Sequence, residues 1–175
     1  MDPAMTAAFT RLGLAAALLA ACIPARAQES LEYAVKAAYL VKFAPFVQWP
    51  QAPVLGSPLA LCVAGSDPFG VTLDKASMGQ PGRPIVIKRM AVLTPDSGCQ
   101  VAFVGGASAA QSLAAIRGQA VLTVSENAAD DSVRGIVNFV VSGGRVRFEI
   151  DPKAAERSRL VISSKLMNLA VPRAR

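Results

Sequence analysis

The sequence contains no histidine. Histidine is the commonest general base near neutral pH and a frequent metal ligand, so its absence excludes Ser-His-Asp catalysis, Cys-His catalysis and histidine metal sites. Charged residues are also scarce, at 17%, whereas 53% of the residues are hydrophobic. A chain this apolar can bury a core, which excludes intrinsic disorder. Its 175 residues are enough for one domain.

Long apolar runs are rare too, and none can span a bilayer. The run over residues 12–21 follows Arg11 and is too short for a transmembrane helix. The small-x-small sequence Ala25-Arg26-Ala27 comes after it. Together these features predict a secretory signal peptide over residues 1–27 and a mature domain over residues 28–175.

The alternative processing route is lipid attachment at Cys22, because Leu19-Ala20-Ala21-Cys22 fits a bacterial lipobox. Both routes predict an exported protein. Removing the signal peptide lowers the formal net charge from +6 to +5. The basic residues are scattered rather than striped, and export argues against nucleic acid. A basic exported protein more often meets membrane surfaces or acidic partners, but the simplest interpretation is a solvated basic surface with no partner.

Two cysteines, Cys62 and Cys99, remain in the mature domain. An even number in an oxidising compartment favours one structural disulfide, with a redox switch as the alternative. The chain-entropy model gives such a cross-link a stabilisation of roughly 3–4 kcal/mol.

An amphipathic segment opens the mature domain. Its apolar residues have helical spacing and predict a helix over residues 30–44, with Lys36 and Lys42 off the apolar stripe. An aromatic patch that includes Phe46 and Trp49 follows. Two interpretations stay open: the patch packs on the sheet, or it binds a partner, because aromatic side chains anchor interfaces. Phe46 and Trp49 are therefore the candidate partner-binding residues.

Short apolar runs alternate with capped helical segments through the middle of the chain. The runs predict strands over residues 59–64, 85–90, 101–104 and 120–124. Residues that can cap a helix follow three of these strands, namely Ser66 or Asp67, Ser108 and Ser125. This alternation predicts parallel strands covered by helices.

Residues 135–169 predict a closing β-β-α unit. Two apolar runs, 136–141 and 146–150, flank Gly143-Gly144, and such a turn is a strong hairpin signal. Alternation in the second run predicts one wet face, which carries Arg145, Arg147 and Glu149.

Asp151-Pro152 then stops the strand and starts a helix, because Asp caps free backbone N–H groups and Pro fits the first turn. The complete pattern predicts an α/β fold. We expect a single domain with a mixed, mostly parallel sheet, helices on both faces, and a C-terminal β-hairpin plus helix.

Three motifs resemble catalytic ones, but structural roles explain them better. Ser108 follows a strand, yet the segment lacks the last glycine of a nucleophile elbow. Glu149 and Asp151 lie two residues apart, but no cleft is implied. Ser163-Ser164-Lys165 lacks the S-x-x-K spacing of acyl-transfer enzymes. The sequence therefore predicts no enzyme, no cofactor and no metal.

A small-ligand site is the alternative function. The turns after the strands, at residues 65–67, 105–108 and 125–127, would gather at the carboxyl ends of the strands. Helix N-termini there can bind anions, and open α/β sheets bind ligands at such crevices. The rival hypothesis is therefore a periplasmic small-ligand carrier.

Two segments carry a resemblance to a known family. Lys36-Ala37-Ala38-Tyr39-Leu40-Val41-Lys42-Phe43-Ala44, with Phe46 and Trp49-Pro50, resembles the opening motif of the YfiR family. Arg145-Val146-Arg147-Phe148-Glu149-Ile150, with Ile162-Ser163-Ser164-Lys165-Leu166, resembles its closing motif. Leu61-Cys62-Val63 and Cys99 fit its middle, so the resemblance covers nearly the whole mature chain.

The resemblance implies a non-catalytic periplasmic repressor. Such a protein binds the periplasmic sensor domain of an inner-membrane diguanylate cyclase and thereby lowers cyclic di-GMP signalling and biofilm formation. An outer-membrane lipoprotein would sequester it, and a homodimer is left open. Cys62 and Cys99 match the family's main disulfide. Some members carry a second cysteine pair, which this chain lacks, so redox control by that pair is not implied here.

Overall fold

The computed structural model describes residues 24–51, 54, 56–128 and 130–173. Most of the predicted signal peptide, Cys22 included, lies outside these residues. Residues 33–175 form one compact unit. No helix in the described ranges is both long and apolar enough to cross a membrane.

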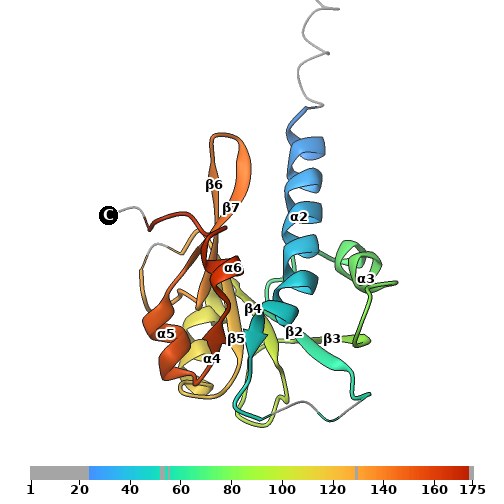
Figure 1. Ribbon diagram of the computed structural model, residues 1–175. Coiled ribbons are helices and arrows are strands. Elements are labelled where there is room, and N and C mark those ends of the chain that lie inside the picture. The colour runs from blue at the N-terminus through green and yellow to red at the C-terminus, as the bar shows by residue number, and fades with distance from the viewer. Residues whose placement is uncertain (1–23, 52–53, 55, 129, 174–175) are drawn as a thin grey trace, which may run out of the picture. The chain divides into compact units, whose positions relative to one another are not determined.

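A six-stranded sheet forms the centre of this unit (Figure 1). The strand order is β3-β2-β4-β5-β6-β7. All neighbours are parallel except the last pair, a hairpin of antiparallel strands. The predicted mixed, mostly parallel sheet is confirmed. Its strands are β2 (Leu59–Gly65), β3 (Ile85–Met90), β4 (Val101–Gly105), β5 (Leu122–Glu126), β6 (Val137–Ser142) and β7 (Arg145–Ile150).

A second, two-stranded sheet joins distant parts of the sequence. β1 (Val47–Gln48) pairs antiparallel with β8 (Val161–Ile162). Just before β1, the carbonyl of Phe46, the last residue of the 3-10 helix η1 (Ala44–Phe46), accepts a 2.9 Å hydrogen bond from the Ser163 amide. The aromatic patch is therefore fixed to the C-terminal segment.

Helices cover both faces of the main sheet, as predicted. Two buried clusters lie on opposite faces, because alternate residues of a strand point to opposite sides. The larger cluster includes side chains from α2 (Pro24–Phe43), α3 (Val71–Ser77), α5 (Pro152–Arg157) and α6 (Ser164–Met167). The smaller one packs under α4 (Ala109–Ala115), which follows the 3-10 helix η2 (Gly106–Ser108).

Aromatic rings form the centre of the larger core. Phe43 of α2 lies with its ring centroid 5.3 Å from that of Phe148 and 5.9 Å from that of Phe139. All three side chains are at most 2% exposed. Each buried phenylalanine contributes about 1.5–3 kcal/mol through its burial. This ring contact fixes α2 over the closing hairpin.

The hairpin follows the sequence prediction, with one exception. Gly143 and Gly144 have φ values of 58° and 69°, the conformation that this turn requires. Arg145 and Arg147 are exposed as predicted, but Glu149 is 7% exposed. The prediction for Glu149 was wrong, because Arg134 and Asn138 bind its carboxylate and allow its burial.

Three of the predicted caps behave differently in the structure. Ser108 precedes α4, but its hydroxyl donates to the Ala91 carbonyl instead of capping the helix. Asp67 accepts from the amides of Phe69 and Gly70, and α3 begins only at Val71. Ser125 lies inside β5, and the described residues from 127 to 135 contain no helix.

The N-terminal caps of α5 and α6 are formed by the residues that directly precede these helices. Asp151 accepts the Ala154 amide at 3.0 Å and so caps α5, as predicted. Ser163 accepts the Leu166 amide at 3.3 Å and caps α6. Both caps satisfy helical N–H groups that otherwise lack partners.

Candidate functional site

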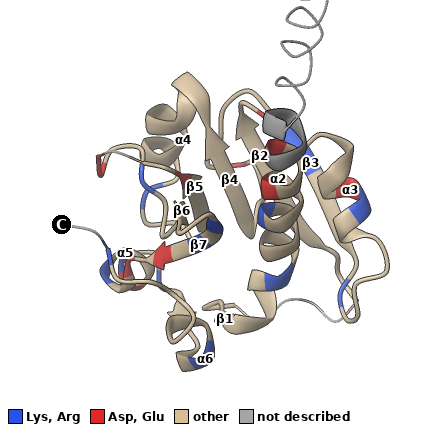
Figure 2. Ribbon diagram, turned by 90° about the horizontal axis from the view of Figure 1, so that it is seen from above, with Lys and Arg blue, Asp and Glu red and all other residues tan. Residues whose placement is uncertain are grey.

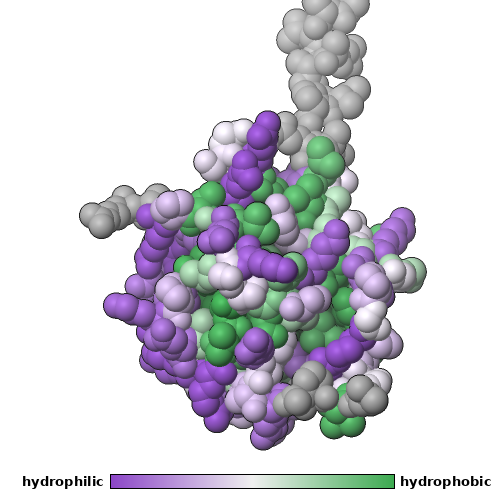
Figure 3. All heavy atoms as spheres, in the orientation of Figure 1, coloured by the Kyte–Doolittle hydropathy of each residue, from purple (hydrophilic) through white to green (hydrophobic). Residues whose placement is uncertain are grey.

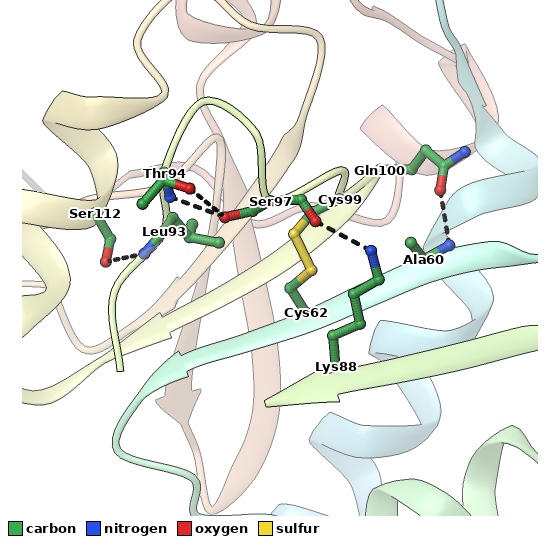
Figure 4. The surroundings of a disulfide bond; sticks show 9 residues. All are labelled: Ala60, Cys62, Lys88, Leu93, Thr94, Ser97, Cys99, Gln100 and Ser112. Carbon is green, nitrogen blue, oxygen red and sulfur yellow. Dashed lines mark hydrogen bonds between the residues drawn. A yellow bond between two sulfur atoms is a disulfide. The ribbon is translucent and has the colours of Figure 1, made fainter. Parts of the chain in front are cut away.

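The predicted disulfide joins Cys62 of β2 to Cys99, just ahead of β4 (Figure 4). The two Cα atoms are 5.9 Å apart, and both residues lie in the smaller core. The Gln100 side-chain oxygen accepts the Ala60 amide at 2.7 Å beside it, and the Ser97 carbonyl accepts from the Lys88 ammonium at 3.1 Å. A buried cross-link in such surroundings is a structural staple rather than an exposed redox centre.

The carboxyl edge of the sheet holds the turns that suggested a ligand crevice. β2 and β4 are neighbours there, and the chain reverses its direction of winding between them. A Cβ atom on Gly65 would collide with the Gly105 carbonyl, and one on Gly106 would collide with the Ser66 hydroxyl. The Ser66 amide also donates to the Gly105 carbonyl at 3.2 Å. The turns after β2 and β4 are therefore in direct contact with each other.

A buried ion pair lies at the end of β5. The Lys36 ammonium of α2 is 2.6 Å from the Glu126 carboxylate and 4.7 Å from the centre of the Tyr33 ring. The Lys36 side chain is fully buried, whereas that of Glu126 is 22% exposed. The prediction that Lys36 lies off the buried stripe was wrong. Only the three-dimensional pairing with Glu126 could have shown otherwise.

The two candidate partner-binding residues are both partly buried. Phe46 and Trp49 pack against the larger core and keep part of their surface exposed. Packing on the body of the domain is therefore part of their role, and partner binding stays a prediction. Val161, which pairs with Gln48 across the small sheet, is 60% exposed. We call Phe46, Trp49, Arg159 and Val161 the terminal surface.

Trp49 borders a hollow of about 350 Å³ at the amino ends of the parallel strands. Other lining residues are Gln51, Arg83, Gln100 and Arg159. The indole nitrogen of Trp49 is buried and has no hydrogen-bond partner among the described residues. This hollow lies at the edge opposite to the one that the sequence suggested.

Arg159 has an unusual backbone conformation in this hollow. Its φ is 57°, in the left-handed region, just after α5. Its amide donates to the Glu156 carbonyl at 2.8 Å, as expected of the residue that ends a helix in this way. Glycine is favoured at such positions, and another residue costs roughly 1–2 kcal/mol. An arginine at this strained position is a candidate for a role that needs its side chain.

A polar network holds the loop between β5 and β6 against the sheet. The Arg134 guanidinium binds the Glu149 carboxylate and donates to the Ala128 carbonyl at 2.7 Å. Asn138 donates to Glu149 at 3.2 Å and accepts from the Ser125 hydroxyl at 2.9 Å. The sequence did not reveal this network, because its members come from three separate segments.

A second hollow is lined by the two carboxylates considered for catalysis. Glu149 and Asp151 line this hollow of about 320 Å³ together with Arg134. However, Glu149 is bound by Arg134, and Asp151 caps α5. Each carboxylate therefore has a structural role, which agrees with the interpretation from the sequence.

An exposed ion cluster fastens α3 to β3, the edge strand. Arg89 donates to Asp67 at 2.7 Å and to Asp74 at 2.7 Å. Burial pushes the pKa of Asp67 upward, but hydrogen bonds from Arg89 and from two backbone amides outweigh it and leave this pKa lowered. The hydrogen bond from Arg89 is the main cause of the lowered pKa of Asp74. Both carboxylates thus stay ionised in mild acid.

A comparison with protein families adds to this geometry. The family model described as YfiR/HmsC-like matches residues 33–171. The match includes both strands of the small sheet and both cysteines of the disulfide. Such a family is regulatory rather than catalytic, and it supports a periplasmic regulatory role in general. Since the match spans most of the chain, this protein belongs to the YfiR/HmsC-like family.

Proposed function

We propose that this protein is a non-catalytic periplasmic repressor. It binds the periplasmic sensor domain of an inner-membrane diguanylate cyclase and holds the enzyme inactive, which lowers cyclic di-GMP and biofilm formation. An outer-membrane lipoprotein that sequesters the repressor would relieve this inhibition. Family membership supports the regulatory role, and the terminal surface supports action through contact with another protein.

The observation that carries the proposal is Arg159 beside Trp49. Arg159 has a strained backbone conformation, and it lines the same hollow as Trp49. Arg and Trp are the residues most enriched among the anchors of protein interfaces. Val161 adds an exposed apolar side chain from the adjoining strand. A strained arginine among partly exposed apolar side chains fits a binding surface better than a surface with a purely structural role.

The rival function, a small-ligand carrier, stays a prediction. The turns after β2 and β4 are in backbone contact, which leaves less room for a ligand between them. A thermal-shift screen of the purified protein with small anions and amino acids tests the rival directly. A strong shift without any partner protein would favour the carrier.

Arg159→Gly separates a binding role from a structural one. Glycine relieves the strain at this position, so we expect the variant to be as stable as the parent or more stable. If Arg159 contacts the cyclase, cells carrying the variant should nevertheless show raised cyclic di-GMP. A stable variant that represses fully would remove Arg159 from the binding surface.

Trp49→Ala is the second variant. Truncating a tryptophan anchor costs about 2 kcal/mol or more of binding free energy, roughly a thirtyfold loss of affinity. Because Trp49 also packs against the core, the thermal midpoint of the variant protein must be measured beside its binding. Deletion of the gene tests the whole proposal: unchanged cyclic di-GMP across growth conditions would contradict the repressor function.

A further inference from the structure

The closing hairpin extends beyond the sheet that it completes (Figure 1). β5 pairs only with residues Val137, Asn138 and Phe139 of β6. Farther along, residues 140–142 of β6 pair with residues 145–147 of β7 and with no other strand among the described residues. We call residues 140–147 the hairpin tip. An isolated two-stranded ribbon adds little stability, so its extra length suggests another use.

The hairpin tip has two different faces. Val141 and Val146 are opposite each other across the strands, and Val141 is 48% exposed. Arg145 and Arg147 lie two residues apart, so both side chains emerge on the other face. Figure 2 shows this basic colouring at the start of β7, and Figure 3 shows hydrophilic side chains at the end of the hairpin. The tip is thus a basic, amphipathic arm.

The nearest carboxylate in the sequence, that of Glu149, lies two residues from Arg147 and is bound by Arg134. Residues 136–148 contain no Asp or Glu, and Arg145 and Arg147 make no hydrogen bond or ion pair with any described residue. In contrast, the guanidinium groups of Arg89, Arg134 and Arg173 all pair with carboxylates of this chain. The charge of the hairpin tip is therefore available to a partner.

The outer edge of β7 is also open near the tip. The C-terminal segment covers this edge at one point, where the Val171 amide donates to the Phe148 carbonyl at 2.9 Å. Backbone groups that point outward recur every second residue, so those of Val146 point the same way. No described residue bonds to the outer edge at Val146. An extended segment of another protein could continue the pairing there.

We propose that the hairpin tip binds an extended acidic segment of the protein partner. The segment runs along the open edge of β7, with carboxylates at alternate positions facing Arg145 and Arg147. This inference rests on the proposed function, since the partner is the periplasmic domain of the cyclase. A lipid surface is the weaker fit, because electrostatic membrane attachment uses clusters of about four to eight basic residues.

The test uses charge reversal with a matched control. Arg145→Glu/Arg147→Glu reverses the charge of the hairpin tip. Arg117→Glu/Lys153→Glu makes the same charge change at exposed sites outside the tip. Each is expressed in the gene-deletion strain at equal abundance, with thermal unfolding as a check of the fold. We expect the tip variant to lose repression and the control to keep it. Arg145→Ala/Arg147→Ala, which adds no carboxylates, should show a smaller loss in the same direction.

A photo-crosslinking amino acid at the exposed Ser142 identifies the occupant in cells. We expect an adduct with a peptide that carries acidic residues at alternate positions, and about a tenfold or greater loss of this adduct in Arg145→Glu/Arg147→Glu. Changing those acidic residues to Arg should restore it. A lipid adduct, an adduct with a second copy of this chain, no adduct, or an adduct insensitive to the charge reversal would each overturn the inference.

The two proposals fail in distinguishable ways. If deleting the gene leaves cyclic di-GMP unchanged, the repressor function is contradicted, whatever the crosslink shows. If deletion raises cyclic di-GMP but the tip variant represses fully, the repressor function stands and the role of the hairpin tip is overturned.

Discussion

The ammonium of Lys36 lies 2.6 Å from the carboxylate of Glu126, and no part of the lysine side chain is exposed. The contact joins α2 to the end of β5, across 90 residues of sequence. A buried charge of this kind is tolerated only with a partner, because removal from water is costly. The pair therefore fixes where α2 lies on the sheet.

We expect the two single replacements at this pair to differ. Glu126→Gln removes the carboxylate that lies 2.6 Å from the buried ammonium and should cost about 3–5 kcal/mol of unfolding free energy. Lys36→Met leaves a carboxylate that water reaches, so about 1–3 kcal/mol is expected. Urea unfolding measures both. The double variant Lys36→Met/Glu126→Leu should recover part of the loss, and a loss equal to the sum of the singles would contradict the coupling.

Loss of the disulfide should lower the stability of the folded domain. The cross-linked residues are 37 positions apart, and a loop of this length corresponds to about 3–4 kcal/mol in the chain-entropy model. Cys62→Ser/Cys99→Ser should therefore show a clearly lower thermal midpoint. Reductant should lower the midpoint of the parent protein and leave the variant unchanged. Free thiols in denatured protein from the periplasm would rule out the cross-link.

The loop between β5 and β6 should loosen when its polar network is broken. In Glu149→Gln the neutral amide replaces a carboxylate that binds the Arg134 guanidinium, and both side chains are largely buried. We expect a cost of about 3 kcal/mol, with faster amide hydrogen exchange confined to residues 128–135. Asp130→Asn, a change on the same loop outside the network, serves as the control. Uniform exchange over the whole protein would argue against local release.

Stability should fall in acid partly through Asp67 and Asp74. Their lowered pKa values mean that the folded state binds fewer protons than the unfolded state. Their contribution is present above the ordinary carboxyl pKa of 3.8 and is lost as the pH falls through the lower folded values. Urea midpoints at pH 5 and pH 3 should differ more in the parent than in Arg89→Met. An identical pH dependence would contradict the assignment.

The sequence predicted the features that depend on local rules. Gly143-Gly144 specified the hairpin, Asp151-Pro152 specified the start of α5, and alternating capped helices implied parallel strands. Each of these follows from the backbone preferences of a few adjacent residues. The even cysteine count of the predicted mature domain also favoured the disulfide between Cys62 and Cys99, which the structure contains.

Features that depend on distant residues could not be read in this way. From the sequence, Lys36 and Glu149 are both predicted to be exposed. In the structure both are buried, because Lys36 pairs with Glu126 and Glu149 pairs with Arg134. Ser108 and Ser125 are residue types that can cap a helix. In the structure, however, the Ser108 hydroxyl donates to the Ala91 carbonyl and the Ser125 hydroxyl donates to the Asn138 side chain. The terminal surface likewise forms only when β1 meets β8.

The contact between the turns at Gly65 and Gly105 has a consequence for the interpretation of variants. In many α/β proteins, a substitution at this edge changes ligand affinity. Here any side chain added at Gly65 or Gly106 collides with the neighbouring turn, so the carboxyl ends of β2 and β4 would separate. Such a variant should therefore fold poorly and be degraded. Its phenotype would then mimic loss of the partner surface, and protein abundance would distinguish the two.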